Sequence, residues 1–275
     1  MTTRLPPFGS AGPVPHAAKG EFEPAGPNSY TGRMAKWLRH DGRAPGDLRP
    51  VRITPDFVSR AAGSCLFEAG GTRVICTASF ARGVPDWRQG RGQGWLTAEY
   101  GMLPASTGVR KARPGIKGDS RGTEIRRLIG RVLRNAVDTR ALGENTVTID
   151  CDVLEADGGT RTAAITGGYV ALAMALARRA EHCAAEGALC RQVAAISVGM
   201  VDGHAVCDLD YAEDASADVD LNVAATSTGR YLEVQGTSER KPFTGTQLQA
   251  MLALARKGIR HLVACQDQAL KEILP

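Results

Sequence analysis

The residues Asp157-Gly158-Gly159-Thr160-Arg161-Thr162 separate two segments whose apolar residues recur with different periods. Before them, residues 147–154 alternate apolar and polar side chains, which is the period of a β-strand. After them, residues 162–179 form an alanine-rich run in which the larger apolar residues have helical spacing. Two arginines close this run, where positive charge suits a helix C-terminus. The pattern predicts a strand, a turn of paired glycines and a helix that begins near Thr162.

This junction between strand and helix is a candidate anion site. The first N–H groups of a helix have no partner within the helix, and they point toward the preceding turn. Arg161 adds a planar set of N–H donors that matches the geometry of phosphate. The alternative is that Gly158 and Gly159 only make a tight connection and that Arg161 pairs with a surface carboxylate. The junction by itself leaves both interpretations open.

The composition indicates a soluble globular chain. Its 275 residues are 43% hydrophobic, which is enough for one large domain or two small ones. No apolar run reaches the roughly 18 residues of a membrane-spanning helix, and the N-terminus lacks the apolar block of a signal peptide. The seven cysteines form no CxxC pair, so we expect reduced thiols and a cytoplasmic protein without a membrane partner. The net charge of +5 is compatible with a polyanionic partner.

The N-terminal part of the chain divides into an extension and a hairpin. Residues 1 to about 40 are rich in proline, glycine and alanine and have no sustained hydrophobic period, which predicts a flexible extension. Residues 64–80 contain two apolar runs on either side of Gly70-Gly71, and paired glycines supply the positive φ of a two-residue hairpin loop. This register places Cys65 opposite Cys76.

The most basic part of the chain follows a predicted strand at residues 94–100. Nine lysines and arginines lie between Arg110 and Arg134, against two acidic residues. The first half of this segment is a glycine-rich loop, and from Thr123 the apolar residues have helical spacing that extends to Val137. We interpret the arginines of the predicted helix as a solvated face. They are Arg126, Arg127, Arg131 and Arg134. The loop arginines have no helix surface to cover, and they are Arg110, Arg113 and Arg121.

The C-terminal part contains a second hairpin and a dense group of acidic residues. Residues 193–211 are predicted to form a hairpin whose turn is Asp202-Gly203. Strands at residues 219–226 and 231–236 follow, and one or two helices cover residues 246–274. Six acidic residues crowd thirteen positions, a density that repels itself unless some members face solvent, a metal ion or a cationic ligand. They are Asp208, Asp210, Glu213, Asp214, Asp218 and Asp220.

The usual signatures of covalent catalysis and nucleotide binding are missing. The five histidines are scattered, and the chain has no HExxH, GxSxG, GxxxxGK[ST] or strand-embedded GxGxxG motif. Three features remain. They are the candidate anion site at Gly159, Thr160 and Arg161, which we call the anion seat, the basic loop from Arg110 to Arg121, and the acidic strand end with Asp208 and Asp214. Chemistry on a phosphodiester needs such a set, because cations neutralise the phosphate oxygens and carboxylates hold a divalent cation or supply a proton. The alternative is that the acidic residues only make an exposed strand soluble.

Four segments carry long motifs in a fixed order, namely Gly92–Pro104, Ala156–Ala163, Cys207–Asp214 and Glu233–Thr237. Together they closely resemble the bacterial ribonuclease PH family. The resemblance implies one α/β (α+β) domain over residues 41–275, with mixed sheets and packed helices, preceded by the extension. It also implies a phosphorolytic 3′-to-5′ exoribonuclease that trims the 3′ ends of tRNA precursors and releases nucleoside diphosphates. Such enzymes assemble as ring-shaped homohexamers of three dimers.

The resemblance assigns a phosphate site. Arg121 and the trio Gly159, Thr160 and Arg161 match the family's phosphate-binding positions. Inorganic phosphate is therefore the expected co-substrate and the attacking group, which agrees with the lack of a side-chain nucleophile.

The resemblance also assigns catalytic and RNA-binding residues. Asp208 and Asp214 match catalytic carboxylates that bind Mg²⁺ or a similar ion, and Asp208 is the expected proton donor to the departing 3′ oxygen. Arg110 and Arg113 match loop positions that contact tRNA. Ala105 stands where the family usually has a further arginine, which predicts weaker tRNA binding.

Two other functions stay open. A non-catalytic RNA-binding ring subunit would share the fold, although such relatives usually lose the acidic pair or the arginine after the paired glycines, and this chain has both. A hydrolytic nuclease would also use carboxylates and a metal ion, but it would release nucleoside monophosphates without needing phosphate.

Overall fold

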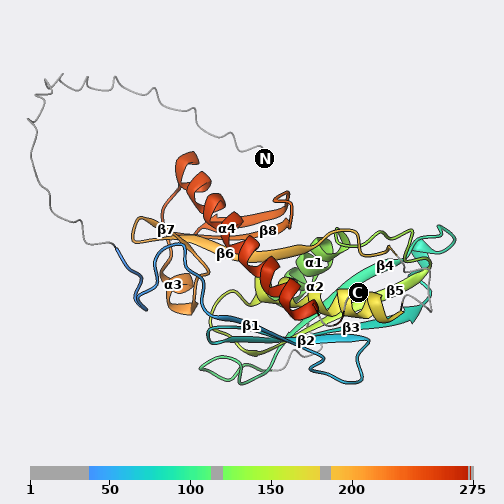
Figure 1. The fold of residues 1–275 in the computed structure, drawn as a ribbon. Coiled ribbons are helices and arrows are strands. Elements are labelled where there is room, and N and C mark those ends of the chain that lie inside the picture. The colour runs from blue at the N-terminus through green and yellow to red at the C-terminus, as the bar shows by residue number, and fades with distance from the viewer. Residues whose placement is uncertain (1–36, 113–119, 180–186, 272, 274–275) are drawn as a thin grey trace, which may run out of the picture. The chain divides into compact units, whose positions relative to one another are not determined.

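The strands form two sheets that are held together by a central helix (Figure 1). The structure, a computed structural model, describes residues 37–112, 120–179, 187–271 and 273. Most of the predicted extension at residues 1–40 therefore lies outside the described residues, and its boundary stays a prediction. The mixed α/β class predicted from the sequence is confirmed.

The first sheet has the strand order β1-β2-β3-β5-β4. Strands β1, β2, β3 and β5 pair antiparallel in that order, whereas β4 lies parallel to β5. A parallel pair needs a crossover connection, and α1 supplies it here. The strands are β1 (Val51–Pro55), β2 (Gly63–Ala69), β3 (Thr72–Arg82), β4 (Trp95–Met102) and β5 (Asn145–Glu155).

The predicted hairpin of paired glycines joins β2 and β3. Ala69 pairs with Thr72 across a two-residue loop, and Gly70 has a φ of 54°. Cys65 lies opposite Cys76, as the register predicts. Both thiols are buried under the central helix.

The second sheet is antiparallel throughout and has the order β7-β6-β8-β9. The predicted Asp202-Gly203 turn joins β6 to β7, and Asp202 has a φ of 50°. The second hairpin strand ends at Cys207 instead of residue 211, because Asp208 has a φ of 57° and leaves the extended conformation. The strands are β6 (Val193–Val201), β7 (His204–Cys207), β8 (Val219–Thr226) and β9 (Tyr231–Ser238).

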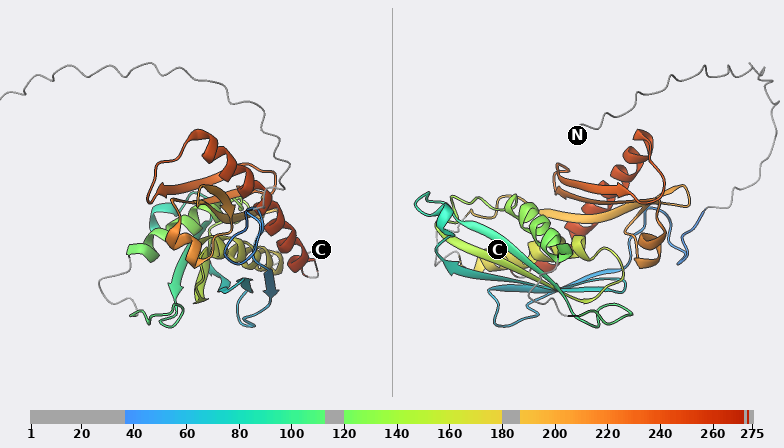
Figure 2. Two further views of the ribbon diagram at one scale, coloured as in Figure 1. Left: turned by 90° about the vertical axis from the view of Figure 1, so that its left-hand side faces the viewer. Right: turned by 180° about the vertical axis from the view of Figure 1, so that it is seen from behind.

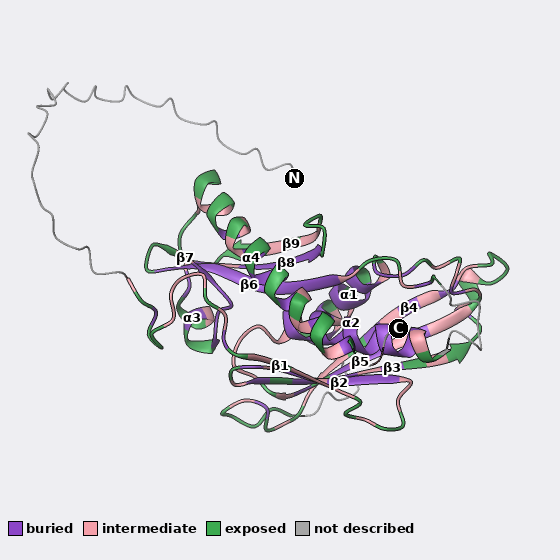
Figure 3. Cartoon of the chain, viewed as in Figure 1, coloured by how far each residue is buried: buried purple, intermediate pink, exposed green. Residues whose placement is uncertain are grey.

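The central helix is α2 (Thr160–Arg179), which packs against strands of both sheets. All its residues from Thr162 to Leu176 are buried, as the purple colour in Figure 3 shows. A helix enclosed on every side must have small residues where other elements come close. A Cβ on Gly167 would lie 2.8 Å from Cys76 Sγ, and one on Gly168 would lie 3.1 Å from Leu133 Cδ1. The alanine and glycine content of this segment therefore reflects its position between the sheets.

Of the two other long helices, α1 lies beside α2 and bonds to β9 of the second sheet, whereas α4 packs against strands of both sheets. In α1 (Ser120–Arg134) the predicted apolar stripe is buried, and the helix packs on β4 and α2. It ends before Val137, which instead forms a single bridge with Leu189. The C-terminal segment is one helix, α4 (Gly245–Leu270), which starts at an N-cap Thr244. It packs on β6 and β7 and reaches β1 of the first sheet (Figure 2).

Two short helices were not predicted. One is η1 (Asp86–Arg88), a single turn between β3 and β4. The other is α3 (Tyr211–Ser216), which begins at Asp210 within the acidic segment. The carboxylate of Asp210 accepts from the backbone N–H of Glu213, and the side chain of Glu213 accepts from the N–H of Asp210. This capping box satisfies two N–H groups at the helix start. None of the described helices has the length and apolar character that crossing a bilayer requires.

Candidate active site

The predicted anion seat opens onto a cavity of about 610 Å³. Its walls come from the end of β4 and the loop after it, the first turns of α1 and α2, the segment after β7, and strand β8. Six of the eight predicted site residues line it, namely Arg110, Arg121, Gly159, Thr160, Arg161 and Asp214. Arg113 lies outside the described residues, and Asp208 is not part of the described lining.

The glycine turn brings the anion seat against the acidic segment. Gly158 and Gly159 have φ values of 77° and 65°, a region that side chains disfavour. A Cβ on Gly158 would also lie 2.5 Å from the carbonyl oxygen of Leu209. Gly158 is therefore required both by its backbone conformation and by the close approach of residues 209–210.

The anion seat itself consists of a helix N-terminus and two arginines. Because α2 begins at Thr160, its unpaired N–H groups face the cavity that Thr160 and Arg161 line. The hydroxyl of Thr160 lies 2.9 Å from Tyr100 Oη, which fixes its orientation. Among the described residues, the one carboxylate within ion-pair distance of Arg161 is that of Glu124, whose Oε1 lies 3.8 Å from Arg161 Nη1. The side chains of Arg161 and of Arg121, which lies in the first turn of α1, both line the cavity where an anion would bind.

Two carboxylates and an amide face these arginines across the cavity. Burial raises the pKa of Asp214, although the charges of Arg161 and Arg121 lower it in part. Burial and the negative charge of Asp214 raise the pKa of Asp220 to about 6. Asn222 Nδ2 lies 3.4 Å from Asp220 Oδ2. The cavity thus combines cationic donors with oxygen ligands, and oxygen ligands are what Mg²⁺ prefers.

The expected pairing of Asp208 with Asp214 at one metal ion stays a prediction, and in this structure Asp208 has a different set of contacts. Its Oδ1 accepts from Arg49 Nη2 at 2.7 Å, and its Oδ2 accepts from the backbone N–H of Arg49 at 2.8 Å and from Nε at 3.0 Å. Arg49 also donates to the carbonyl oxygen of Asp157. Arg49 therefore joins Asp208 to the glycine turn, and the carboxylate beside Asp214 in the cavity is Asp220.

Asp208 is one member of a buried network of charges that we call the arginine network. It joins the segment from Arg39 to Arg49 with the carboxylates of Asp208, Asp210 and Glu213. Arg39 donates to both carboxylate oxygens of Glu213 and, at 2.6 Å, to the carbonyl oxygen of Cys207. Arg43 lies 3.4 Å from Asp210 Oδ2 and 3.5 Å from Glu213 Oε2. Each carboxylate of the network thus has at least one guanidinium partner.

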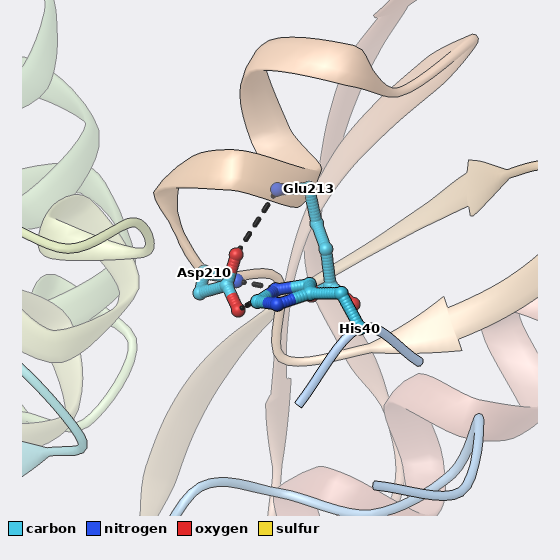
Figure 4. Close-up of side chains that lie close together, drawn as sticks. All are labelled: His40, Asp210 and Glu213. Atoms are coloured by element: carbon cyan, nitrogen blue, oxygen red, sulfur yellow. Dashed lines mark hydrogen bonds and ion pairs between the residues drawn. The ribbon is translucent and has the colours of Figure 1, made fainter. Parts of the chain in front are cut away.

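Part of this network has the spacing of a metal site but not its chemistry. Side-chain atoms of His40, Asp210 and Glu213 lie within 4.8 Å of one another (Figure 4). His40 Nε2 is 2.7 Å from Asp210 Oδ2. The guanidinium groups of Arg39 and Arg43 already neutralise these carboxylates. Positive charges at this distance disfavour a divalent cation, so we assign the cluster a structural role.

The open side of the cavity is apolar and basic. Val109 and Tyr211 are 81% and 66% exposed, and both line the cavity beside Arg110 and Lys111. Ala105, at the position of the missing arginine, is exposed. The mouth of the cavity therefore presents both apolar side chains and positive charge.

Sequence reasoning named Asp220 among the acidic residues but did not single it out, and it missed Asn222 and Arg49. A signal for the first two exists. Asp220 and Asn222 alternate with Val219 and Leu221 in a strand, so both polar side chains project from one face of the sheet. Polar residues on one face of an otherwise apolar strand indicate a site. No comparable pattern marks Arg49, because its partner Asp208 is far away in sequence.

Comparisons with known proteins agree with this fold. The model of the 3′ exoribonuclease family, domain 1, matches residues 47–177, and the model of domain 2 of that family matches residues 191–258. Among solved structures the chain is similar to rice (Oryza sativa) Rrp46, with 17% identity and a TM-score of 0.69 over 84% of this chain and 100% of that one. It is also similar to a chain of the Archaeoglobus fulgidus exosome with RNA bound to the active site. There the identity is 20% and the TM-score 0.69, over 82% of this chain and 91% of that one.

Proposed function

The chain belongs to the 3′ exoribonuclease family, and from this premise we propose that it is a phosphorolytic 3′-to-5′ exoribonuclease. One observation carries the proposal, namely that Arg121, Arg161, Asp214 and Asp220 line a single cavity. Inorganic phosphate is the co-substrate, and nucleoside diphosphates are the products. The 3′ ends of tRNA precursors are the proposed substrates, and the proposed site of action is the cytoplasm.

The anion seat binds the attacking phosphate. Phosphate and the phosphodiester are both anions, so positively charged groups must lie beside them to offset their repulsion. Arg121, Arg161 and the N–H groups at the start of α2 supply that charge from two helices. The phosphate is itself the nucleophile, so no side-chain nucleophile is needed. Holding it in line with the last phosphodiester lowers much of the activation barrier.

Asp214 and Asp220, with the amide oxygen of Asn222, fit Mg²⁺. When bound, the ion would neutralise charge on the phosphodiester and its departing 3′ oxygen. Among the described residues that line the cavity, these two are the only acidic ones, so we assign them to this role in place of Asp208. Their raised pKa values reflect burial, and for Asp220 also the repulsion of Asp214, which a cation relieves.

The second candidate is a non-catalytic RNA-binding subunit of a ring. Its support is the fold shared with a chain of an exosome that has RNA bound. For the catalytic candidate, the proposed assembly is a ring of six copies. The two candidates differ at the cavity. A binding subunit has no need of carboxylates beside a phosphate seat, and this difference favours catalysis.

One assay separates the candidates. A short RNA with a 3′ tail is incubated with the protein and Mg²⁺, with and without phosphate, and the released nucleotide is identified. We expect nucleoside diphosphates that depend on phosphate. Monophosphates released without phosphate would identify a hydrolytic nuclease, and binding without release would identify a ring subunit. Arg60→Ala, which changes an exposed arginine outside the cavity, is the control and should match the wild type.

A further inference from the structure

A second basic hollow lies along α1, beyond the cavity. It has a volume of about 480 Å³ and lies between one face of the helix and the edge strand β4. Four arginines of α1 line it together with Trp95 and Glu99. They are Arg126, Arg127, Arg131 and Arg134, which the sequence suggested to be a solvated face. We call this hollow and the adjoining Trp87 and Arg88 the arginine–tryptophan groove.

The positive charge of this groove is only partly neutralised. Arg126 pairs with Glu99 at 3.1 Å, and Arg131 pairs with Glu233 at 2.9 Å. Among the described residues, no carboxylate lies within ion-pair distance of Arg88, Arg127 or Arg134. Burial first, and then the charges of Arg131 and Arg88, lower the pKa of Arg134. Crowded guanidinium groups of this kind are stabilised by an anion.

Two tryptophans add an aromatic surface to the positive charge of the groove. Trp87 is 56% exposed and packs edge-on against Trp95, with ring centroids 4.8 Å apart. The guanidinium carbon of Arg134 lies 4.5 Å from the centre of the Trp95 ring, and that of Arg88 lies 5.2 Å from it. The exposed ring of Trp87 is therefore held in place by its neighbours. A fixed aromatic face beside cations suits stacking of a nucleobase.

We propose that the arginine–tryptophan groove binds the single-stranded part of an RNA whose 3′ end occupies the cavity. The inference rests on the proposed function, because that function places the 3′ end of the RNA in the cavity. Helix α1 connects the two places, since Arg121 lines the cavity and Arg127 to Arg134 line the groove. At 1.5 Å per residue, Arg134 lies roughly 20 Å along the helix from Arg121. That span corresponds to about six stacked nucleotides at 3.4 Å each.

Single-stranded RNA fits this groove better than an acidic protein surface does. Stacking on an aromatic ring and contact with the phosphate backbone do not depend on base sequence. An enzyme that removes one nucleotide after another must hold a changing sequence, and this chemistry allows it. An acidic protein segment would use the arginines but would leave the exposed ring of Trp87 without a matching partner.

The test compares RNAs of three and twelve nucleotides, because only the longer one spans both places. Binding of each labelled RNA is measured by fluorescence anisotropy without phosphate or Mg²⁺, which prevents turnover. The variants are Trp87→Ala and Arg127→Glu, and Arg60→Glu is the control with the same change of charge at an exposed site outside the groove. Both groove variants should weaken binding of the long RNA about tenfold. They should leave binding of the short RNA unchanged, and Arg60→Glu should change neither.

The slope of log affinity against log salt should also fall by about 0.7 for each RNA phosphate that Arg127→Glu no longer binds. Unchanged binding of the long RNA in both groove variants overturns the inference. An equal loss in Arg60→Glu also overturns it, because the effect would then follow net charge alone. A change in oligomeric state in the groove variants, measured by light scattering, would overturn it by making this face an interface between copies. If the wild type binds the long RNA tightly but releases no nucleotide, the proposed function fails and the groove stands.

Discussion

The acidic segment from Asp208 to Asp220 serves two neighbouring regions in opposite ways. In the arginine network, Asp208 and Glu213 are buried and bound to guanidinium groups. In the cavity, Asp214 and Asp220 face arginines across open space instead. Charges that have protein partners hold elements together, whereas charges without them are available to a ligand. The same residue type at adjacent positions therefore has a structural role in one region and a chemical role in the other.

The pKa values of the two regions show the same contrast, because the carboxylate with protein partners has a lowered pKa and the carboxylate in the cavity has a raised one. Burial raises the pKa of both Asp210 and Asp220, but bonds from Glu213 and His40 and the charge of Arg43 lower that of Asp210 overall. The pKa of Asp220 stays high, at about 6, because the negative charge of Asp214 adds to the effect of burial. A group whose ionised form is unsatisfied in the free protein is a better candidate for binding a cation.

The largest effect is expected from removing one partner of the arginine network. Arg39→Ala leaves the carboxylate of Glu213 buried without its main partner, which should reduce the free energy of unfolding by about 3–5 kcal/mol. Denaturant unfolding followed by circular dichroism measures it. Activity per folded molecule should be retained, since Arg39 does not line the cavity. Normal stability in this variant would contradict a structural role for the network.

Removing a hydrogen-bond donor from the cavity should reduce activity and leave stability almost unchanged. Arg161→Ala takes away a cation that faces the phosphate, so we expect a loss of about 10² to 10³ in rate, or roughly 2.7–4 kcal/mol of transition-state stabilisation. The defect should be greatest at low phosphate, as steady-state kinetics at varied phosphate would show. Unfolding should change little, because the one carboxylate near Arg161 in the described part of the chain lies 3.8 Å away. Full activity at low phosphate would remove Arg161 from the site.

A pair of matched substitutions tests which aspartate, Asp208 or Asp220, serves the cavity together with Asp214. Asp208→Asn weakens a bidentate ion pair with Arg49 and should reduce stability by about 1–3 kcal/mol. Asp220→Asn should leave stability unchanged or raise it, while activity with Mg²⁺ falls by roughly 10². Thermal unfolding and nucleotide release are measured on both. The assignment is wrong if Asp208→Asn alone abolishes turnover in a fully folded protein.

The smallest effect is expected from the titration of Asp210. Its folded pKa lies below the usual value of 3.8, so ionised Asp210 adds stability above that pH, and this is lost as the pH falls through the folded pKa. Asp210→Asn keeps a capping side chain and should make the acid limb of the stability curve shallower, by under about 1 kcal/mol. Urea unfolding between about pH 2 and about pH 5 measures the slope. An unchanged slope would exclude Asp210 as a contributor.

The sequence was a good guide where local patterns decide the outcome. The hairpin at Gly70-Gly71 and the pairing of Cys65 with Cys76 follow from alternation and turn chemistry, and both are confirmed. The strand, glycine turn and helix around residue 158 are confirmed as well, with the helix starting two residues earlier than predicted. These features depend on residues close together in the chain, so their physical causes are visible in the sequence.

The sequence was a poor guide where distant residues choose between similar side chains. Six acidic residues in thirteen positions give no local sign of which ones meet an arginine, because Arg39 and Arg49 lie more than 150 positions before Asp208. Helix α3 was missed for a related reason. Its capping box lies inside the acidic segment, where repulsion would otherwise oppose a helix. Only the packed structure supplies the cations that offset this repulsion.

The short helix α3 determines which residues serve each region. Glu213 and Asp214 are consecutive, and one residue of α-helix turns the side chain by about 100°, so Glu213 points to the arginine network and Asp214 to the cavity. Inserting or deleting a single residue at its start would rotate both side chains by about 100° and take each of them away from its region. This short helix is therefore less tolerant of length variation than most surface segments of its size, and a relative that uses the same two side chains in the same way is expected to keep its residue count.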